Sequence, residues 1–104
     1  RGTRLISLPI DDISYFYTKD RLQYIKTAKG ENYVIDKRLE EIETEISGTD
    51  FFRVNRQFIV SYNSIEKVYS WFSGKLKVDL RPGAHEEILI SRLKAAEFRK
   101  WLGE

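Results

Sequence analysis

The sequence predicts a single, mainly β domain with two short helices, extending over residues 1–104. Short runs rich in β-branched and aromatic residues recur along the chain, and several alternate between apolar and polar residues as half-buried strands do. Glycine, proline or asparagine separates these runs, as in the tight connections of antiparallel sheets. Repeated short hairpins of this kind are typical of a β meander or sandwich.

Seven runs are predicted strands, and turn-forming residues separate most of them. The strands occupy residues 13–17, 22–27, 32–35, 58–62, 65–72, 75–80 and 86–91. In the run KLKVDL, the apolar residues Leu76, Val78 and Leu80 share one face. Lys75 and Lys77 then lie on a solvated face. The turn signals are Gly30, Asn63-Ser64, Ser73-Gly74, which fits a two-residue hairpin loop, and Pro82-Gly83.

An acidic helix is predicted between residues 36 and 48, where the strand pattern stops. Leu39, Ile42 and Ile46 recur there at helical spacing. Asp36 is placed to cap this helix and Gly48 to end it. Its remaining positions are mostly glutamates, so we expect a helix that shows carboxylates to solvent.

The end of the chain, residues 91–104, is the second predicted helix. Ser91 can cap its first turn, because a serine hydroxyl accepts a hydrogen bond from a free N–H group there. We expect Leu93, Ala96 and then Trp101 to face the core.

The composition indicates one soluble, folded domain. Apolar residues make up 41% and charged residues 33% of the chain, as in globular rather than disordered proteins. The absence of cysteine excludes disulfides and thiolate metal sites and fits a reducing, cytoplasmic compartment. No run approaches the roughly 18 apolar residues of a membrane span, so we expect no membrane contact. Because the chain begins with Arg1 and contains no methionine, we expect it to be a fragment of a longer protein.

Charge is distributed unevenly, although the formal net charge is only +2. Residues 31–50 carry two Lys and Arg against seven Asp and Glu, whereas the rest of the chain carries sixteen against nine. A protein with one side facing a polyanion would show this asymmetry. An acidic helix on the surface of any domain would give a similar division.

Catalytic chemistry is poorly represented. His85 is the single histidine and lies in a predicted turn, where histidine is usually solvated. Glu86 and Glu87 are neighbours on a predicted strand, so they point to opposite faces and should not converge as an acid–base pair. The sequence contains no phosphate-binding glycine loop and no nucleophile elbow. We therefore expect no enzyme activity, no catalytic residue, no metal ion and no cofactor.

Basic and amide side chains gather at three corners between predicted elements. The corners are TKDRLQ (18–23), RVNRQ (53–57) and SRLK (91–94). Arginine forms bidentate hydrogen bonds with guanine, asparagine and glutamine do the same with adenine, and lysine neutralises phosphate. Three such corners on one edge would form a loop-based interface for duplex DNA. The alternative is that loops are polar in any protein.

Two long runs carry a family resemblance. FFRVNRQFIVSYNSIEKV (51–68) resembles the signature of the LytTR DNA-binding domain family, in which an aromatic pair, an arginine and polar residues precede an aromatic, a β-branched pair, Asn and Ile. Upstream, IDDISYFYTKDRLQYIKTAKGENYVIDKRLEEIE (10–43) is similar to the family's N-terminal part. The resemblance therefore covers nearly the whole chain.

The resemblance implies a fold, a function and partners. Members of the family have an elongated β–β–β arrangement of mostly antiparallel strands with a short helix, and insert loops into successive major grooves of double-stranded DNA. They usually form the C-terminal output half of bacterial transcriptional response regulators, behind a phosphorylated receiver domain on the same chain. Two protomers commonly pair on direct repeats. These properties are our expectations for this chain.

The resemblance also implies roles for individual residues. Arg92 matches the family's base-contacting arginine after the last strand, and Asn55, Arg56 and Gln57 occupy its variable polar positions, which reach base edges. Arg53 sets the loop or contacts phosphate, or alternatively forms an ion pair with the acidic helix. The other predicted DNA contacts are Lys19, Arg21, Gln23 and Lys94.

The first corner departs from some members of the family. No histidine occupies this loop, so its DNA contact must be made differently. Asp20 would repel phosphate unless it is paired with a neighbour.

Two other functions compete with duplex binding. One is a β-rich protein-interaction module that pairs an exposed edge strand with a partner peptide. The other is a binder of single-stranded nucleic acid, which needs exposed aromatic rings on a sheet face. The sequence favours duplex DNA, because the hydrogen-bond donors cluster at corners while the aromatic residues alternate into strands.

Overall fold

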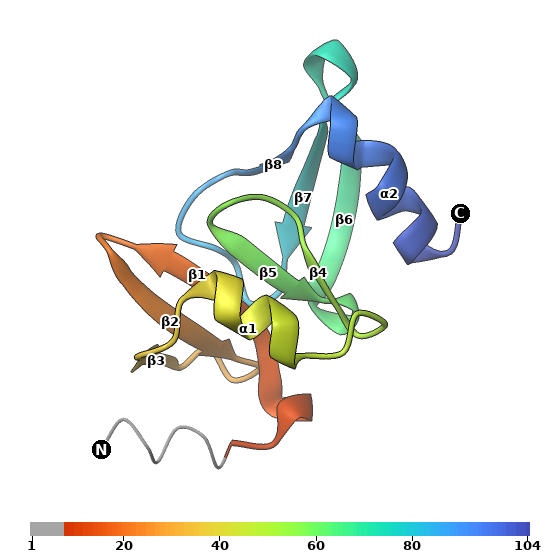
Figure 1. Ribbon diagram of the computed structural model, residues 1–104. Coiled ribbons are helices and arrows are strands. Elements are labelled where there is room, and N and C mark those ends of the chain that lie inside the picture. Colours follow the sequence, from red (N-terminus) through yellow and green to blue (C-terminus); the bar gives the residue numbers. More distant parts are fainter. Residues whose placement is uncertain (1–7) are drawn as a thin grey trace.

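Two antiparallel β-sheets form the body of the protein, which a computed structural model describes for residues 8–104 (Figure 1). The larger sheet has the strand order β3-β2-β1-β5-β4, and the smaller sheet has the order β6-β7-β8. The strands are β1 (Ile13–Lys19), β2 (Leu22–Thr27), β3 (Asn32–Ile35), β4 (Phe51–Arg53), β5 (Phe58–Ser61), β6 (Ile65–Ser70), β7 (Leu76–Leu80) and β8 (Ile88–Ile90). With principal extents of 43 × 27 × 24 Å, the molecule is elongated. The predicted mainly β, elongated fold with two helices is confirmed; its first seven residues lie outside the described part.

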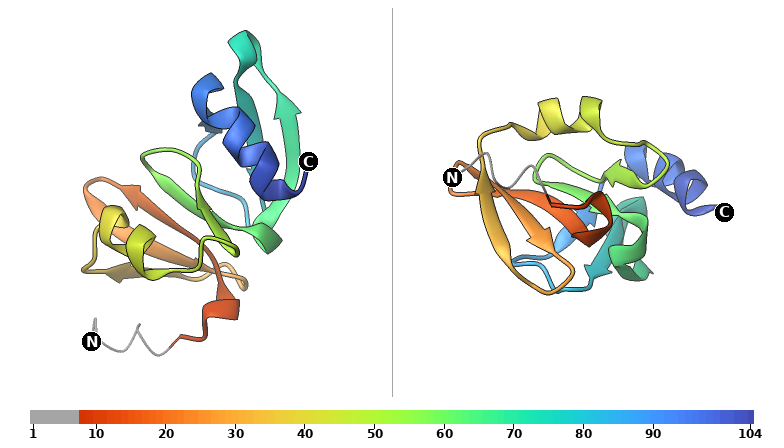
Figure 2. Two further views of the ribbon diagram at one scale, coloured as in Figure 1. Left: turned by 45° about the vertical axis from the view of Figure 1, so that its right-hand side comes forward. Right: turned by 90° about the horizontal axis from the view of Figure 1, so that it is seen from below.

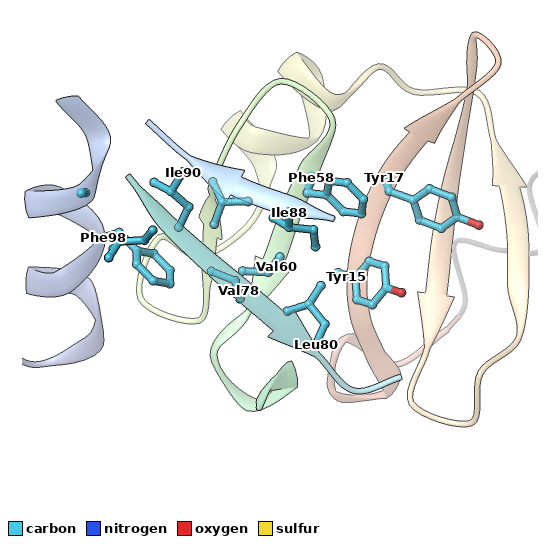
Figure 3. Close-up of a cluster of buried hydrophobic side chains, with 12 residues drawn as sticks. Tyr15, Tyr17, Phe58, Val60, Val78, Leu80, Ile88, Ile90 and Phe98 are labelled. Carbon is cyan, nitrogen blue, oxygen red and sulfur yellow. The ribbon is translucent and has the colours of Figure 1, made fainter. Parts of the chain in front are cut away.

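The two sheets face each other across the main hydrophobic core (Figure 3). Tyr15 and Phe58 from the larger sheet and Ile88 and Ile90 from the smaller sheet are at most 1% exposed there. The alternation predicted for KLKVDL is confirmed, because Leu76, Val78 and Leu80 all enter this core. The hydroxyl of Tyr15 donates a hydrogen bond to the Gly83 carbonyl (3.0 Å), so the phenol is satisfied inside an apolar layer.

Helix α1 (Leu39–Glu45) covers the opposite face of the larger sheet (Figure 2). Leu39 and Ile42 of the helix pack there against Phe16 and Ile59. Strand β1 is therefore buried on both faces, which explains why its sequence ISYFY is almost continuously apolar rather than alternating.

The predicted capping of α1 is wrong. Arg38, not Asp36, precedes the first helical residue, and the Glu41 carboxylate accepts a hydrogen bond from the Arg38 backbone N–H (2.9 Å). This carboxylate satisfies a free N–H group of the first turn, so no Asp is needed as a cap. At the other end the chain becomes extended at Ile46, two residues before Gly48.

Helix α2 (Arg92–Leu102) begins as predicted but turns a different face to the core. The Ser91 hydroxyl accepts a hydrogen bond from the Lys94 N–H (3.2 Å). Ala95 and Phe98 are buried, whereas Leu93 is 90% exposed and Ala96 is exposed. The inward-facing set was thus wrong for Leu93 and Ala96, because the contact of the helix with the sheets follows the spacing of Ala95, Phe98 and Leu102.

The connection between β6 and β7 is longer than the predicted two-residue loop. Strand β6 ends at Ser70, and the Trp71 N–H donates a hydrogen bond to the Lys75 carbonyl (2.9 Å) across a five-residue turn. Ser73 and Gly74 adopt positive φ values of 57° and 77°. Phe72, predicted to end a strand, lies on this turn and is 76% exposed.

Candidate nucleic-acid interface

The first predicted corner is the two-residue turn between β1 and β2. Lys19 pairs with Leu22, and Asp20 and Arg21 between them have φ values of 50° and 70°, as a type I′ turn requires. Lys19 and Arg21 are exposed at the tip of the hairpin. Gln23 lies one residue further from the turn than Leu22, and its amide donates a long hydrogen bond to the Thr18 hydroxyl (3.4 Å).

Arg53 organises the second corner, the loop between β4 and β5. Its guanidinium donates hydrogen bonds to the backbone carbonyls of Asn55 (3.1 Å) and Arg56 (2.8 Å). The same group forms ion pairs with Glu40 (3.2 Å) and Glu43 (3.1 Å) of α1. Its side chain is only 13% exposed. Arg53 therefore sets the loop and also pairs with the acidic helix, two of the roles considered for it.

Asn55 holds the same loop from inside. Its side-chain oxygen accepts hydrogen bonds from the N–H groups of Gln57 (2.9 Å) and Phe58 (3.0 Å). Its amide nitrogen donates to the Leu89 carbonyl (3.0 Å). The side chains of Arg56 and Gln57, in contrast, are exposed. Within this one polar run, Arg53 and Asn55 hold the loop, whereas Arg56 and Gln57 project from it.

The third corner is the junction of β8 and α2. Ser91 caps the helix, which places Arg92 in its first turn with an exposed side chain. Lys94 lies two residues further along the helix, with its Nζ atom 5.6 Å from the centre of the Phe52 ring. The ammonium therefore projects over a ring of β4.

Hydrogen bonds tie the three corners to one another. The Thr18 N–H at the end of β1 donates to the Gln57 carbonyl (3.0 Å), which connects the first corner to the second. The bond from Asn55 to the Leu89 carbonyl connects the second corner to β8 and so to the third. Figures 1 and 2 show the β1–β2 turn, the β4–β5 loop and the start of α2 following one another along one side of the molecule.

A shallow hollow of about 620 Å³ lies between the second and third corners. Its charged lining consists of Arg53, Arg56, Lys75 and Lys94, with Glu40 and Glu43 at one side. Sequence reasoning assigned Lys75 to a plain solvated face. Its place directly after the predicted Ser73-Gly74 turn was the only signal that it belongs with the corners.

The charges at the corners differ in how they are paired. Within residues 8–104, no ion pair involves Lys19, Arg21, Arg56, Arg92 or Lys94, so five of the predicted cations are available to an anionic partner. The carboxylates of Glu40 and Glu43 on α1 form ion pairs with Arg53 and not with these five cations. The backbone N–H of Glu40 and then the Arg53 guanidinium lower the pKa of the Glu40 carboxyl, so it stays ionised at neutral pH.

Three other features of residues 8–104 bear on function: the environment of His85, metal-binding groups and membrane-spanning helices. The imidazole of His85, predicted to be solvated, packs against the rings of Tyr17 (5.2 Å between centres) and Phe58 (5.7 Å), and its side chain is 24% exposed. Among residues 8–104, no group of three or more His, Asp and Glu side chains is arranged to hold a metal ion. No helix in these residues has the length and apolar character needed to cross a membrane.

Comparison with known sequences agrees with the family resemblance of the two long runs. The family model described as the LytTr DNA-binding domain matches residues 3–103. The transcriptional regulatory protein YpdB of Escherichia coli K12 is 31% identical over 100 residues, which is 96% of this chain and 40% of that protein. The sensory transduction protein LytT of Bacillus subtilis is 30% identical over 101 residues, which is 97% of this chain and 41% of that protein.

A solved structure has a closely similar fold. It is the LytTr DNA-binding domain of a Bacillus cereus response regulator, with a TM-score of 0.79 and 27% sequence identity. The match covers 93% of this chain and 86% of that one. The chain spans about two fifths of the length of the curated relatives it matches.

Proposed function

The chain belongs to the LytTR DNA-binding domain family, and from this we propose that its three corners enter successive major grooves of double-stranded DNA. The observation that carries the proposal is the pair of links from Thr18 to Gln57 and from Asn55 to Leu89. They hold the three corners along one side, where five cations have no acidic partner within residues 8–104. Preordered donors lower the entropic cost of binding.

We assign different roles to the projecting and the holding residues. Arg56, Gln57 and Arg92 project and have the chemistry to contact base edges. The other projecting cations, Lys19, Arg21, Lys75 and Lys94, contact phosphates or neighbouring bases, and Gln23 supports the first turn. Arg53 and Asn55 serve DNA binding by fixing the backbone from which Arg56 and Gln57 project.

Alanine variants separate base contacts from phosphate contacts. Arg56→Ala and Arg92→Ala should each cost about 1–3 kcal/mol on the preferred duplex and relax preference at one or two base pairs. Lys19→Ala and Lys94→Ala should weaken all sequences about equally and lower the slope of log binding constant against log salt by about one unit. The preferred duplex comes from selection on random sequences, and affinities from titrations at several salt concentrations.

Thermal melting of the same four variants provides the control. If Arg56 and Arg92 only braced the fold, their variants would melt earlier and bind poorly in proportion to the unfolded fraction. Folded variants that keep the full ratio between preferred and scrambled duplexes would contradict the assigned base contacts.

Relief of backbone strain in the first turn should separate stability from binding. Arg21→Gly should raise the free energy of unfolding by about 0.5–1 kcal/mol, because only glycine adopts positive φ without steric cost. It should weaken DNA binding, because a projecting cation is lost. Asp20→Gly is the matched control. It relieves the backbone strain at the neighbouring position, but it keeps the Arg21 cation and removes an anion. Urea denaturation and duplex titration of both variants test this, and an Arg21→Gly variant with undiminished affinity would contradict it.

The domain is proposed to be the output part of a cytoplasmic transcriptional response regulator with a receiver domain elsewhere on its chain. Support comes from YpdB and LytT, described as transcriptional regulatory and sensory transduction proteins and more than twice as long as this chain. Bacterial DNA lies in the cytoplasm, and a regulator that binds it would act there. We propose no catalytic activity for the domain, because its polar residues are arranged for binding.

Protomers are proposed to pair on direct repeats of the binding site and to be monomers without DNA. A heptad segment is absent from residues 8–104, and α2 already uses its apolar face inside the protomer. Sedimentation of the free chain should give a monomer, and two chains should bind per duplex with two half-sites. A tight dimer in the absence of DNA would contradict this.

The competing protein-interaction function needs an exposed edge strand, and β6 is such a strand. It lies at the edge of the smaller sheet, with Val68 and Tyr69 each 37% exposed. Glu66, in an ion pair with Arg81, and Lys67 place charges along the strand, a common protection against edge pairing. Duplex binding therefore remains the conclusion that the geometry supports best.

A further inference from the structure

The side chain of Arg92 lies directly on Gly74 of the β6–β7 turn. A Cβ atom built on Gly74 would be 2.8 Å from the Arg92 Cδ atom and 2.9 Å from its Cγ atom. Both distances are shorter than real Cβ contacts allow. The stem of this arginine therefore occupies the space that any other residue at position 74 would fill.

The turn that carries Gly74 is braced from within. The Trp71 N–H bonds to the Lys75 carbonyl (2.9 Å), and the Lys75 N–H bonds back to the Phe72 carbonyl (3.1 Å). The Lys77 Nζ atom lies 5.2 Å from the centre of the Trp71 ring. Gly74 thus belongs to a turn whose backbone is held by its own hydrogen bonds. Arg92, which contacts Gly74, projects from the capped first turn of α2.

We propose that Gly74 is a positioning residue for base reading by Arg92. The glycine surface supports the arginine stem and directs the guanidinium outward, so the bidentate geometry is formed before DNA arrives. This inference rests on the proposed function, in which Arg92 contacts a base edge. Together with the role proposed for Lys75, it assigns the β6–β7 turn, which none of the contacts predicted from the sequence included, to the DNA-binding side of the molecule.

A side chain at position 74 should displace Arg92 rather than unfold the turn. The atoms that a Cβ would meet belong to a flexible side chain with other available rotamers, not to backbone. The guanidinium would then leave its outward orientation. Bidentate hydrogen bonding depends strongly on the position and plane of the guanidinium, so the pair with guanine would be lost while the charge remained.

Gly30 provides a matched control. It also has a positive φ, 90° against 77° for Gly74, but a Cβ there would meet no atom within 4 Å. Gly30→Ala and Gly74→Ala therefore impose similar backbone strain, and only the second interferes with Arg92. Gly74→Asn adds a Cβ with less strain, because asparagine tolerates positive φ, and keeps the test valid if the alanine variant folds poorly.

The experiment compares Gly30→Ala, Gly74→Ala, Gly74→Asn, Arg92→Ala and the double variant Gly74→Ala/Arg92→Ala. Each is titrated with the selected duplex and with duplexes altered at single base pairs, after melting curves have shown it to be folded. We expect both Gly74 variants to lose discrimination about 5- to 100-fold at the base pair that Arg92→Ala relaxes. The double variant should match Arg92→Ala, and Gly30→Ala should keep the full profile.

The outcomes separate this inference from the function on which it rests. If Arg92→Ala relaxes one base pair but the Gly74 variants do not, Gly74 does not position Arg92. The same conclusion follows if Gly74→Ala reduces discrimination as much in the Arg92→Ala background as in the original chain. If Arg92→Ala itself leaves every preference intact, the proposed base contact of Arg92 is wrong, and this inference is overturned with it.

Discussion

Replacing Phe98 with alanine should lower the free energy of unfolding by about 3–5 kcal/mol. Phe98 is 0% exposed, and its ring packs against those of Phe52 (5.4 Å between centres) and Trp101 (5.8 Å). It is one of two buried residues that attach α2 to the sheets. Because a domain of this size has only about 5–15 kcal/mol of stability, the variant should be marginally folded.

Leu93→Ala is the matched control for this prediction. It removes a large apolar side chain from the same helix, but one that is 90% exposed, so stability should change by less than about 0.5 kcal/mol. Urea denaturation followed by circular dichroism measures both. Similar losses for the two variants would mean that α2 contacts the sheets through a different face.

Arg53→Ala should cost about 2–3 kcal/mol of stability and weaken binding to every duplex sequence. The substitution removes two charge-assisted hydrogen bonds to loop carbonyls, each stronger than an ordinary neutral bond. Arg56 and Gln57 would then project from a mobile loop and pay an ordering cost on binding. Arg53→Lys should rescue little, because an ammonium cannot reproduce the planar fork that reaches both carbonyls.

The ion pairs with α1 are tested separately. The variant Glu40→Ala/Glu43→Ala keeps the bonds from Arg53 to the loop and removes only exposed carboxylates, so it should cost much less stability than Arg53→Ala. Denaturation and duplex titration should be compared for all three variants. If loss of the two carboxylates matched the loss of Arg53, the ion pairs rather than the carbonyl bonds would hold the loop.

Most strands could be predicted from the sequence because their pattern is local. Burial of Leu76, Val78 and Leu80 on one face follows from alternation alone. The register of α2 could not be predicted in this way, because Leu93 and Ala95 are equally good candidates until the sheets select one face of the helix. The cap of α1 was missed for a related reason: Glu41 reaches back from inside the helix, and Asp36 offered a more familiar signal.

The residue types of the candidate site could be predicted from the sequence. Which of these residues hold the loop and which project from it could not. Asn55 and Arg56 are adjacent polar residues, and both suit contact with a base. Only the positions of Leu89 and Phe58, distant or buried parts of the fold, show that the Asn55 amide is already occupied. The contact between Gly74 and Arg92 joins positions eighteen residues apart on different elements, so no local pattern indicates it.

The layered arrangement of the sheets has a consequence for the spacing of the sites that such a domain recognises. The first two corners belong to the larger sheet, whereas the third follows β8 of the smaller sheet. The side chains between the sheets, such as Val78 and Ile88, therefore act as a spacer of about 10 Å between the first two corners and the third. In the proposed binding mode, a change in the volume of this spacer alters which base pairs are read together, although no spacer residue touches DNA.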